Sequence, residues 1–137
     1  FTMIKVPLPI IGVKGIYRFA DRIITWPQRA RDIDHLSHEI MKIGIILEDQ
    51  GTGGGGFRFL YATYLRQCSE ILNNPLLKEF AERLMIIGDQ WRELSLFVAR
   101  IGKNRDLGTD RIRELSAMIR KRGDGEKAFF NDLSKVF

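Results

Sequence analysis

The chain has 137 residues, of which 45% are hydrophobic and 28% charged; these are values of a globular domain and exclude intrinsic disorder. No apolar run reaches the roughly 18 residues that cross a bilayer, and the single cysteine, Cys68, excludes an intrachain disulfide and a cysteine-based zinc site. Length and composition therefore predict one cytoplasmic domain that has no membrane as a partner.

Residues 1–13 are expected to form an extended connector, because Pro7 and Pro9 remove backbone donors and fix φ. The chain begins at Phe1 and has no basic stretch followed by an apolar stretch and a cleavage site. We therefore expect it to be a fragment of a longer protein.

The remainder shows apolar residues at helical spacing, interrupted by turn residues. A Trp-Pro pair, an Asn-Asn-Pro triplet and Gly123-Asp124-Gly125 are predicted to separate helices. Gly44 and Gly88, inside two of the helices, are predicted to mark close helix crossings. The sequence predicts an all-α, single compact domain over 1–137 with five or six helices and a glycine-rich inter-helix loop; the expected helices span 14–24, 28–49, 57–72, 75–101, 109–121 and 126–136.

The most specific stretch lies before the third of these helices, where five of six consecutive residues are glycine. It comprises Gly51, Thr52, Gly53, Gly54, Gly55, Gly56, Phe57 and Arg58. Exposed backbone N–H groups at a helix N-terminus suit an anion, and Arg58 could pair with a carboxylate or phosphate. However, the stretch lacks the Gly-Lys-Ser/Thr ending of a P-loop, and a helix precedes it where a nucleotide fold needs a strand. The pattern favours a packing loop that contacts a neighbouring domain, with anion or acyl-group contact as the alternative.

Other reactive side chains form no recognisable catalytic or metal-binding pattern. His35, His38 and Glu39 share one predicted helix but lack the zincin spacing and a third ligand. Cys68 lies on the apolar side of helix 57–72, and no histidine follows it, so we expect a buried, inert thiol. The sequence accordingly predicts no catalytic residue, no metal ligand and no cofactor.

The net charge of +5 comes mostly from residues 100–122, where eight lysines and arginines face three acids. Such a segment can bind nucleic acid or an acidic protein. A solvated helix face explains it more simply, and no recognition helix with a clear turn is visible. Nucleic acid is therefore the less favoured partner.

The run Gly51-Thr-Gly-Gly-Gly-Gly-Phe-Arg-Phe-Leu-Tyr-Ala-Thr-Tyr-Leu, followed by Trp91-Arg-Glu-Leu, carries a resemblance that covers about residues 27–101. It resembles the C-terminal helical domain of proteins similar to butirosin biosynthesis protein H. The resemblance implies a preceding papain-like domain with a cysteine nucleophile, and an acyltransferase that moves an acyl group from a carrier protein to an aminoglycoside amine. That catalytic domain is absent from this sequence, so no nucleophile is assigned to any residue here.

The resulting expectation is an accessory, substrate-binding helical domain of a larger acyltransferase or cysteine-hydrolase-like enzyme of secondary metabolism, not itself catalytic. Its expected partners are the missing N-terminal catalytic domain and an acyl carrier protein, which would meet the basic segment. The alternative is a stand-alone interaction or regulatory module that binds nucleic acid through residues 100–122. A phosphate- or nucleotide-binding protein and an oligomer of identical chains stay open.

Overall fold

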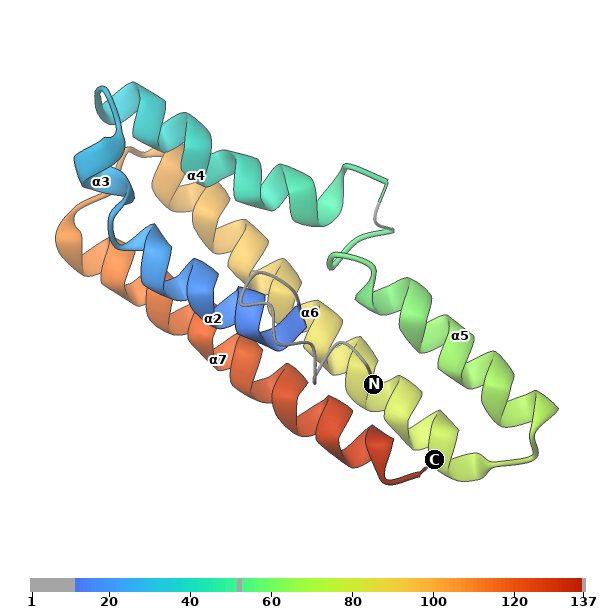
Figure 1. The fold of residues 1–137 in the computed structure, drawn as a ribbon. Coiled ribbons are helices and arrows are strands. Elements are labelled where there is room, and N and C mark those ends of the chain that lie inside the picture. Colours follow the sequence, from blue (N-terminus) through green and yellow to red (C-terminus); the bar gives the residue numbers. More distant parts are fainter. Residues whose placement is uncertain (1–11, 52, 137) are drawn as a thin grey trace.

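The computed structural model describes residues 12–51 and 53–136, and over these residues the chain is all-α (Figure 1). The all-α prediction is confirmed. Most of the predicted connector falls on residues 1–11, outside the described residues, whereas Gly12 and Val13 already belong to the first described helix. The six helices of the described residues are α2 (Gly12–Ile23), α3 (Trp26–Arg29), α4 (Ile33–Glu48), α5 (Arg58–Ile71), α6 (Pro75–Lys103) and α7 (Thr109–Ser134).

The 29-residue α6 is the central element. Its start follows from local sequence, because the Asn74 side chain accepts a hydrogen bond from the Leu76 N–H at 3.2 Å and Pro75 occupies the first turn. Helices α4 and α5 pack against α6 one after the other along its length (Figure 1). Helix α7 packs against the other side of α6, and α2 packs against α7. Fully buried side chains of α6 and α7, including Leu84, Leu94 and Phe129, form the centre of the core.

Close helix crossings at Gly44 and Gly88 are confirmed. A Cβ atom at Gly44 would lie 3.3 Å from the Ser95 carbonyl oxygen, and one at Gly88 would lie 2.6 Å from Cε1 of Phe59. Both contacts join α6 to the helices that cross it. The cost of about 1 kcal/mol for glycine inside a helix is thus offset by packing that a side chain would prevent.

The predicted break at Gly123-Asp124-Gly125 is wrong, because α7 continues through it as one helix of 26 residues. Gly123 lies beneath α2, where a Cβ would approach Cε1 of Tyr17 to 2.9 Å. The Tyr17 hydroxyl also donates a hydrogen bond to Oδ1 of Asp124 at 2.5 Å. Tertiary contact with α2 therefore outweighs the weak helix propensity of two glycines.

The single helix predicted over 28–49 is also wrong in its first turns, since the structure divides that segment into α3 and α4. Asp32 is extended and its carboxylate accepts a hydrogen bond from the His35 N–H at 2.7 Å, which makes Asp32 the N-cap of α4.

No helix in the described part of the chain combines the length and apolarity that crossing a membrane requires.

Candidate functional site

The glycine loop, residues 51–57, folds back on the end of α4. Glycines 51 and 53–56 all have positive φ values between 57° and 81°, as the sequence analysis predicts for a packing loop. The Gly56 N–H donates to the Leu47 carbonyl at 2.9 Å, and the Gly55 N–H donates to Oε1 of Glu48 at 3.3 Å. These two donors are therefore used within the chain. Thr52 lies outside the described residues.

The loop also needs glycines because it lies directly on α6. A Cβ at Gly55 would lie 3.2 Å from the Gly88 carbonyl oxygen, and a Cβ at Gly54 would lie 2.9 Å from Nη2 of Arg92. Phe57, the last residue of the loop, has φ 70° although it is not glycine. The loop is thus a tightly packed connection between α4 and α5, both of which pack against α6.

Arg58, the first residue of α5, has its guanidinium turned into the protein. Its Nε donates to Oε1 of Glu126 on α7 at 2.6 Å, and its Nη1 donates to the Gly56 carbonyl at 2.8 Å. The guanidinium carbon lies 4.4 Å from the ring centre of Trp91. The side chains of Arg58 and Glu126 are only 19% and 7% exposed. A carboxylate of the chain itself thus occupies the place next to Arg58 where the sequence suggests an external anion.

Glu126 joins three helices, because its Oε1 also accepts a hydrogen bond from Nε1 of Trp91 on α6 at 2.7 Å. Sequence reasoning missed Glu126 because the residue directly follows the predicted break at 123–125. Trp91, whose indole N–H needs a partner when buried, was the available signal. The Arg58–Glu126–Trp91 cluster is the principal polar contact between the two sides of α6.

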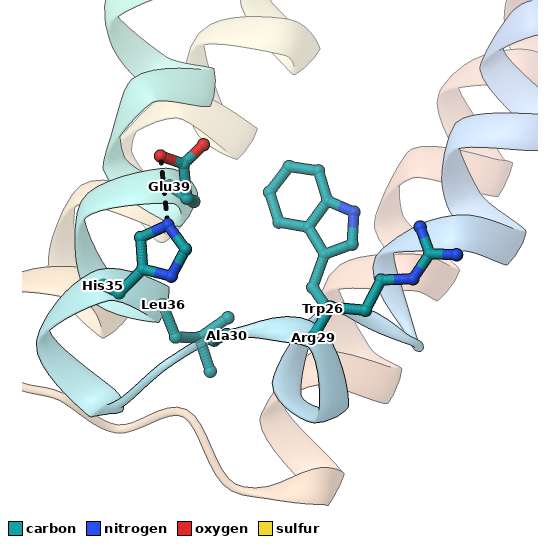
Figure 2. Close-up of a pocket in the computed structure, with 6 residues that line it drawn as sticks. All are labelled: Trp26, Arg29, Ala30, His35, Leu36 and Glu39. Carbon is teal, nitrogen blue, oxygen red and sulfur yellow. Dashed lines mark ion pairs between the residues drawn. The ribbon is translucent and has the colours of Figure 1, made fainter.

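Two cavities adjoin this cluster, and a third lies next to one of them. The Trp26 cavity, of about 310 Å³, lies between α3 and α4 (Figure 2). A middle cavity of about 340 Å³ shares Trp26 and Glu39 with it and extends to Arg58. The Glu126 cavity, of about 490 Å³, begins at Arg58 and is lined by residues of α2, α5, α6, α7 and the glycine loop. Arg58 therefore separates the two larger cavities.

The His35 side chain, which the sequence places beside Glu39, makes its contacts within the chain. Nδ1 of His35 accepts a hydrogen bond from the Arg31 N–H at 3.1 Å, while its Nε2 lies 3.8 Å from Oε1 of Glu39 (Figure 2). A hydrogen bond from Nζ of Lys42, at 2.7 Å, lowers the pKa of Glu39. Across residues 12–51 and 53–136 no three His, Cys, Asp or Glu side chains gather in a way that could hold a metal ion.

The outer face of α5 consists of five large apolar residues that are more than half exposed: Phe57 (57%), Leu60 (54%), Tyr64 (57%), Ile71 (78%) and Leu72 (58%). The helix instead buries Ala62, Leu65 and Ser69 against α6. Cys68 is half-buried, so the prediction of a buried thiol is wrong. Apolar periodicity identifies the residues that share a side of the helix, but the position of α6 decides which side is covered.

Half of the basic side chains between 100 and 122 have partners within the chain. Carboxylates pair with Arg105, Arg111 and Arg120, and the buried Arg122 donates to the Gln90 carbonyl at 2.9 Å. Burial lowers the pKa of Arg122. The other four make no ion pair with any residue that the structure describes; they are Arg100, Lys103, Arg113 and Lys121. The free positive charge of this segment is therefore about half of what the sequence suggests.

Comparison with known proteins identifies the domain but no characterised relative. No curated protein and no solved structure matches the chain. A family model described as a domain of unknown function (DUF4872) matches residues 1–133, almost the whole chain. The chain therefore belongs to the DUF4872 family.

Proposed function

We propose that this chain is an accessory, substrate-binding domain of a larger acyltransferase or cysteine-hydrolase-like enzyme, and that it docks on the catalytic domain through the glycine loop and the outer face of α5. The observation that carries the proposal is this exposed apolar face. Contiguous apolar surface of this kind marks sites where one protein surface meets another.

The outer face has the geometry of a docking surface. Phe57, Tyr64 and Ile71 follow one another at intervals of seven residues, so they lie along one line of the helix, with Leu60 beside them. Covering such side chains is favourable by about 25 cal/mol for each Å² of apolar surface removed from water. A Cβ at Gly53 would lie 3.0 Å from Cγ of Leu60, which places the loop backbone against this face. The loop and the outer face of α5 form one continuous surface.

The resemblance to the C-terminal domain of butirosin-H-like proteins supports a catalytic domain as the occupant. Residues 51–65, the longer of the two runs that carry the resemblance, include most of the proposed surface. In proteins of that kind a papain-like domain precedes the helical domain. A loop without side chains lets a substrate or a thioester arm pass close to the backbone. An acidic acyl carrier protein is the second proposed partner, and the four basic side chains without an ion pair in the described chain support it.

The test uses the enzyme's catalytic domain, expressed separately, and this chain added to it. Leu60→Glu places a charge on the outer face and is expected to weaken association by at least about tenfold, with a matching loss of acyl transfer. Thr63→Glu adds the same charge to an exposed position of the same helix, outside that face, and is the matched control.

Equal association of the two variants would refute docking through α5. The acyl-transfer assignment has a separate test: an upstream coding region of about 150 residues without a cysteine and a histidine contradicts it, whatever α5 binds.

A further inference from the structure

We propose that the Glu126 cavity binds a small neutral ligand that carries an amide group on an apolar body, with the amide placed between Arg58 and Glu126. This inference rests on the cavity and its polar atoms, not on the proposed docking surface, so either proposal can fail alone. The volume of about 490 Å³ lies within the roughly 300–1,000 Å³ of small-molecule sites.

The walls of the cavity suit an apolar body. Val13 and Ile16 of α2, Leu84 of α6 and Phe130 of α7 line it, and Leu84 is 1% exposed. These residues come from three helices that the core already holds in place, so the cavity needs no rearrangement to form. An apolar group that enters replaces water at hydrophobic walls, which is favourable.

The polar atoms of the cavity come from a pair that is only partly satisfied. Oε1 of Glu126 accepts two hydrogen bonds, but its Oε2 accepts none from the residues that the structure describes. No fully buried side-chain oxygen or nitrogen lacks a partner in the described residues, so solvent reaches Oε2, and the cavity is the space that Glu126 lines. Nη2 of Arg58 likewise donates to no group within residues 12–51 and 53–136, whereas Nε and Nη1 do. The site offers a free acceptor and a free donor on two side chains in contact.

The charge of this pair selects the type of ligand. Arg58 and Glu126 neutralise each other, so a charged head group would lose hydration without meeting a net opposite charge. A secondary amide loses less, and its N–H can donate to Oε2 while its carbonyl accepts from Nη2. Tyr61 also lines the cavity. Donor, acceptor and apolar wall together fit an amide better than a carboxylate or an ammonium.

The two tryptophans allow binding to be located by nuclear magnetic resonance on the whole 137-residue chain. The Trp91 indole N–H donates to Glu126, and Trp91 also lines the middle cavity, whereas Trp26 lines the middle cavity and the Trp26 cavity. A ligand in the Glu126 cavity therefore affects Trp91 through Glu126, whereas a ligand in the middle cavity contacts both tryptophans. N-Hexylacetamide is the probe, and its dissociation constant is expected to be about 1 mM for so small a molecule. It should shift the indole signal of Trp91 more than that of Trp26, and Trp26→Phe assigns the signals. No shift of Trp91 at probe concentrations well above 1 mM would overturn the proposal.

Matched probes test the amide. N-Hexyl-N-methylacetamide has the same body without the N–H and is expected to bind about tenfold more weakly, the effect of one hydrogen bond. Hexylammonium and heptanoate should bind more weakly still. Equal affinity for the methylated amide, or tightest binding of either ion, would show that the pair does not select an amide.

Matched variants test the location. Ile16→Trp fills the Glu126 cavity and is expected to abolish binding, whereas Ile46→Trp adds the same side chain to the middle cavity and should leave the affinity unchanged. Unchanged urea midpoints show that both variants fold. Should Ile16→Trp not fold, the comparison of the two amides on the unmodified chain still decides. Binding that survives Ile16→Trp in a folded variant would contradict the assignment to this cavity.

Discussion

Glu126→Gln is the substitution that best tests how the two sides of α6 are joined. The change keeps the shape of the side chain and an oxygen that can accept from Trp91, but removes the charge opposite Arg58. In the present structure Nε of Arg58 lies 2.6 Å from Oε1 of Glu126, and the two side chains are 19% and 7% exposed. The guanidinium of the variant would stay largely buried without a carboxylate.

The expected cost follows from these contacts. Breaking a buried ion pair costs about 3–5 kcal/mol when the remaining charge has no other partner. Arg58 keeps the carbonyls of Gly55 and Gly56 as acceptors, at 3.3 and 2.8 Å, and its ring contact with Trp91. The glutamine also preserves one hydrogen bond. We therefore expect the free energy of unfolding to fall by about 2–3 kcal/mol.

Urea denaturation followed by circular dichroism measures this loss as a lower midpoint with an unchanged slope. Asp132→Asn is the control, because Asp132 is also an α7 acid paired with an arginine, Arg83 at 3.0 Å, but these two side chains are 46% and 43% exposed. It should cost less than about 1 kcal/mol. Equal losses for the two variants would refute the reasoning.

A double-mutant cycle sharpens the result. Arg58→Met combined with Glu126→Gln should show a coupling energy of at least about 1.5 kcal/mol, because the two groups are in direct contact. Additive losses would mean that the pair stabilises the domain no more than its separate burial does.

Three further predictions concern backbone and titration. Gly125→Ala, where an added Cβ meets nothing within 4 Å, should raise the free energy of unfolding by about 1 kcal/mol. Gly88→Ala should instead lower it by at least about 1 kcal/mol, because the added Cβ would clash with the Phe59 ring of α5. Urea midpoints of the two variants that move in the same direction would contradict this. Phe57→Gly should raise stability by about 1 kcal/mol by relieving its φ of 70°, with a loss of docking as the counterpart; a lower midpoint would show that the side chain stabilises the fold. Burial, followed by the Asp124 carboxylate, raises the pKa of Tyr17 to about 12. Stability from this hydroxyl is therefore intact below the unfolded pKa near 10 and is lost as pH rises through about 12. In an ultraviolet absorbance titration, Tyr17→Phe should remove the last tyrosine to ionise, and a titration curve that keeps this step would contradict the assignment.

Local signals predicted the elements of the fold well. Asn74 and Pro75 mark the start of α6. The positive φ values of the glycine loop follow from its composition, because glycine adopts such values freely. Gly88 was predictable as a close crossing because it interrupts an otherwise continuous apolar stripe. Each of these depends on residues within one or two turns of each other, which a single sequence displays.

Contacts between distant residues were not predictable in the same way. Gly123 and Asp124 read as a break until Tyr17, more than a hundred residues earlier, is placed against them. The structural role of Glu126 follows only from its hydrogen bonds with Arg58 and Trp91, which lie on two other helices. Nothing in the spacing of these residues indicates that they meet.

The sequence by itself thus determined an all-α domain, the start of α6, two close helix crossings, and a glycine loop at a helix start. Tertiary structure alone decided that Arg58 faces Glu126, that a cavity opens beside this pair, and that the apolar outer face of α5 stays uncovered. The physical reason is that helix formation depends on neighbours along the chain, whereas burial and charge pairing depend on which helices pack together. The apolar stripe of α5 has the same spacing whether α6 covers it or leaves it exposed.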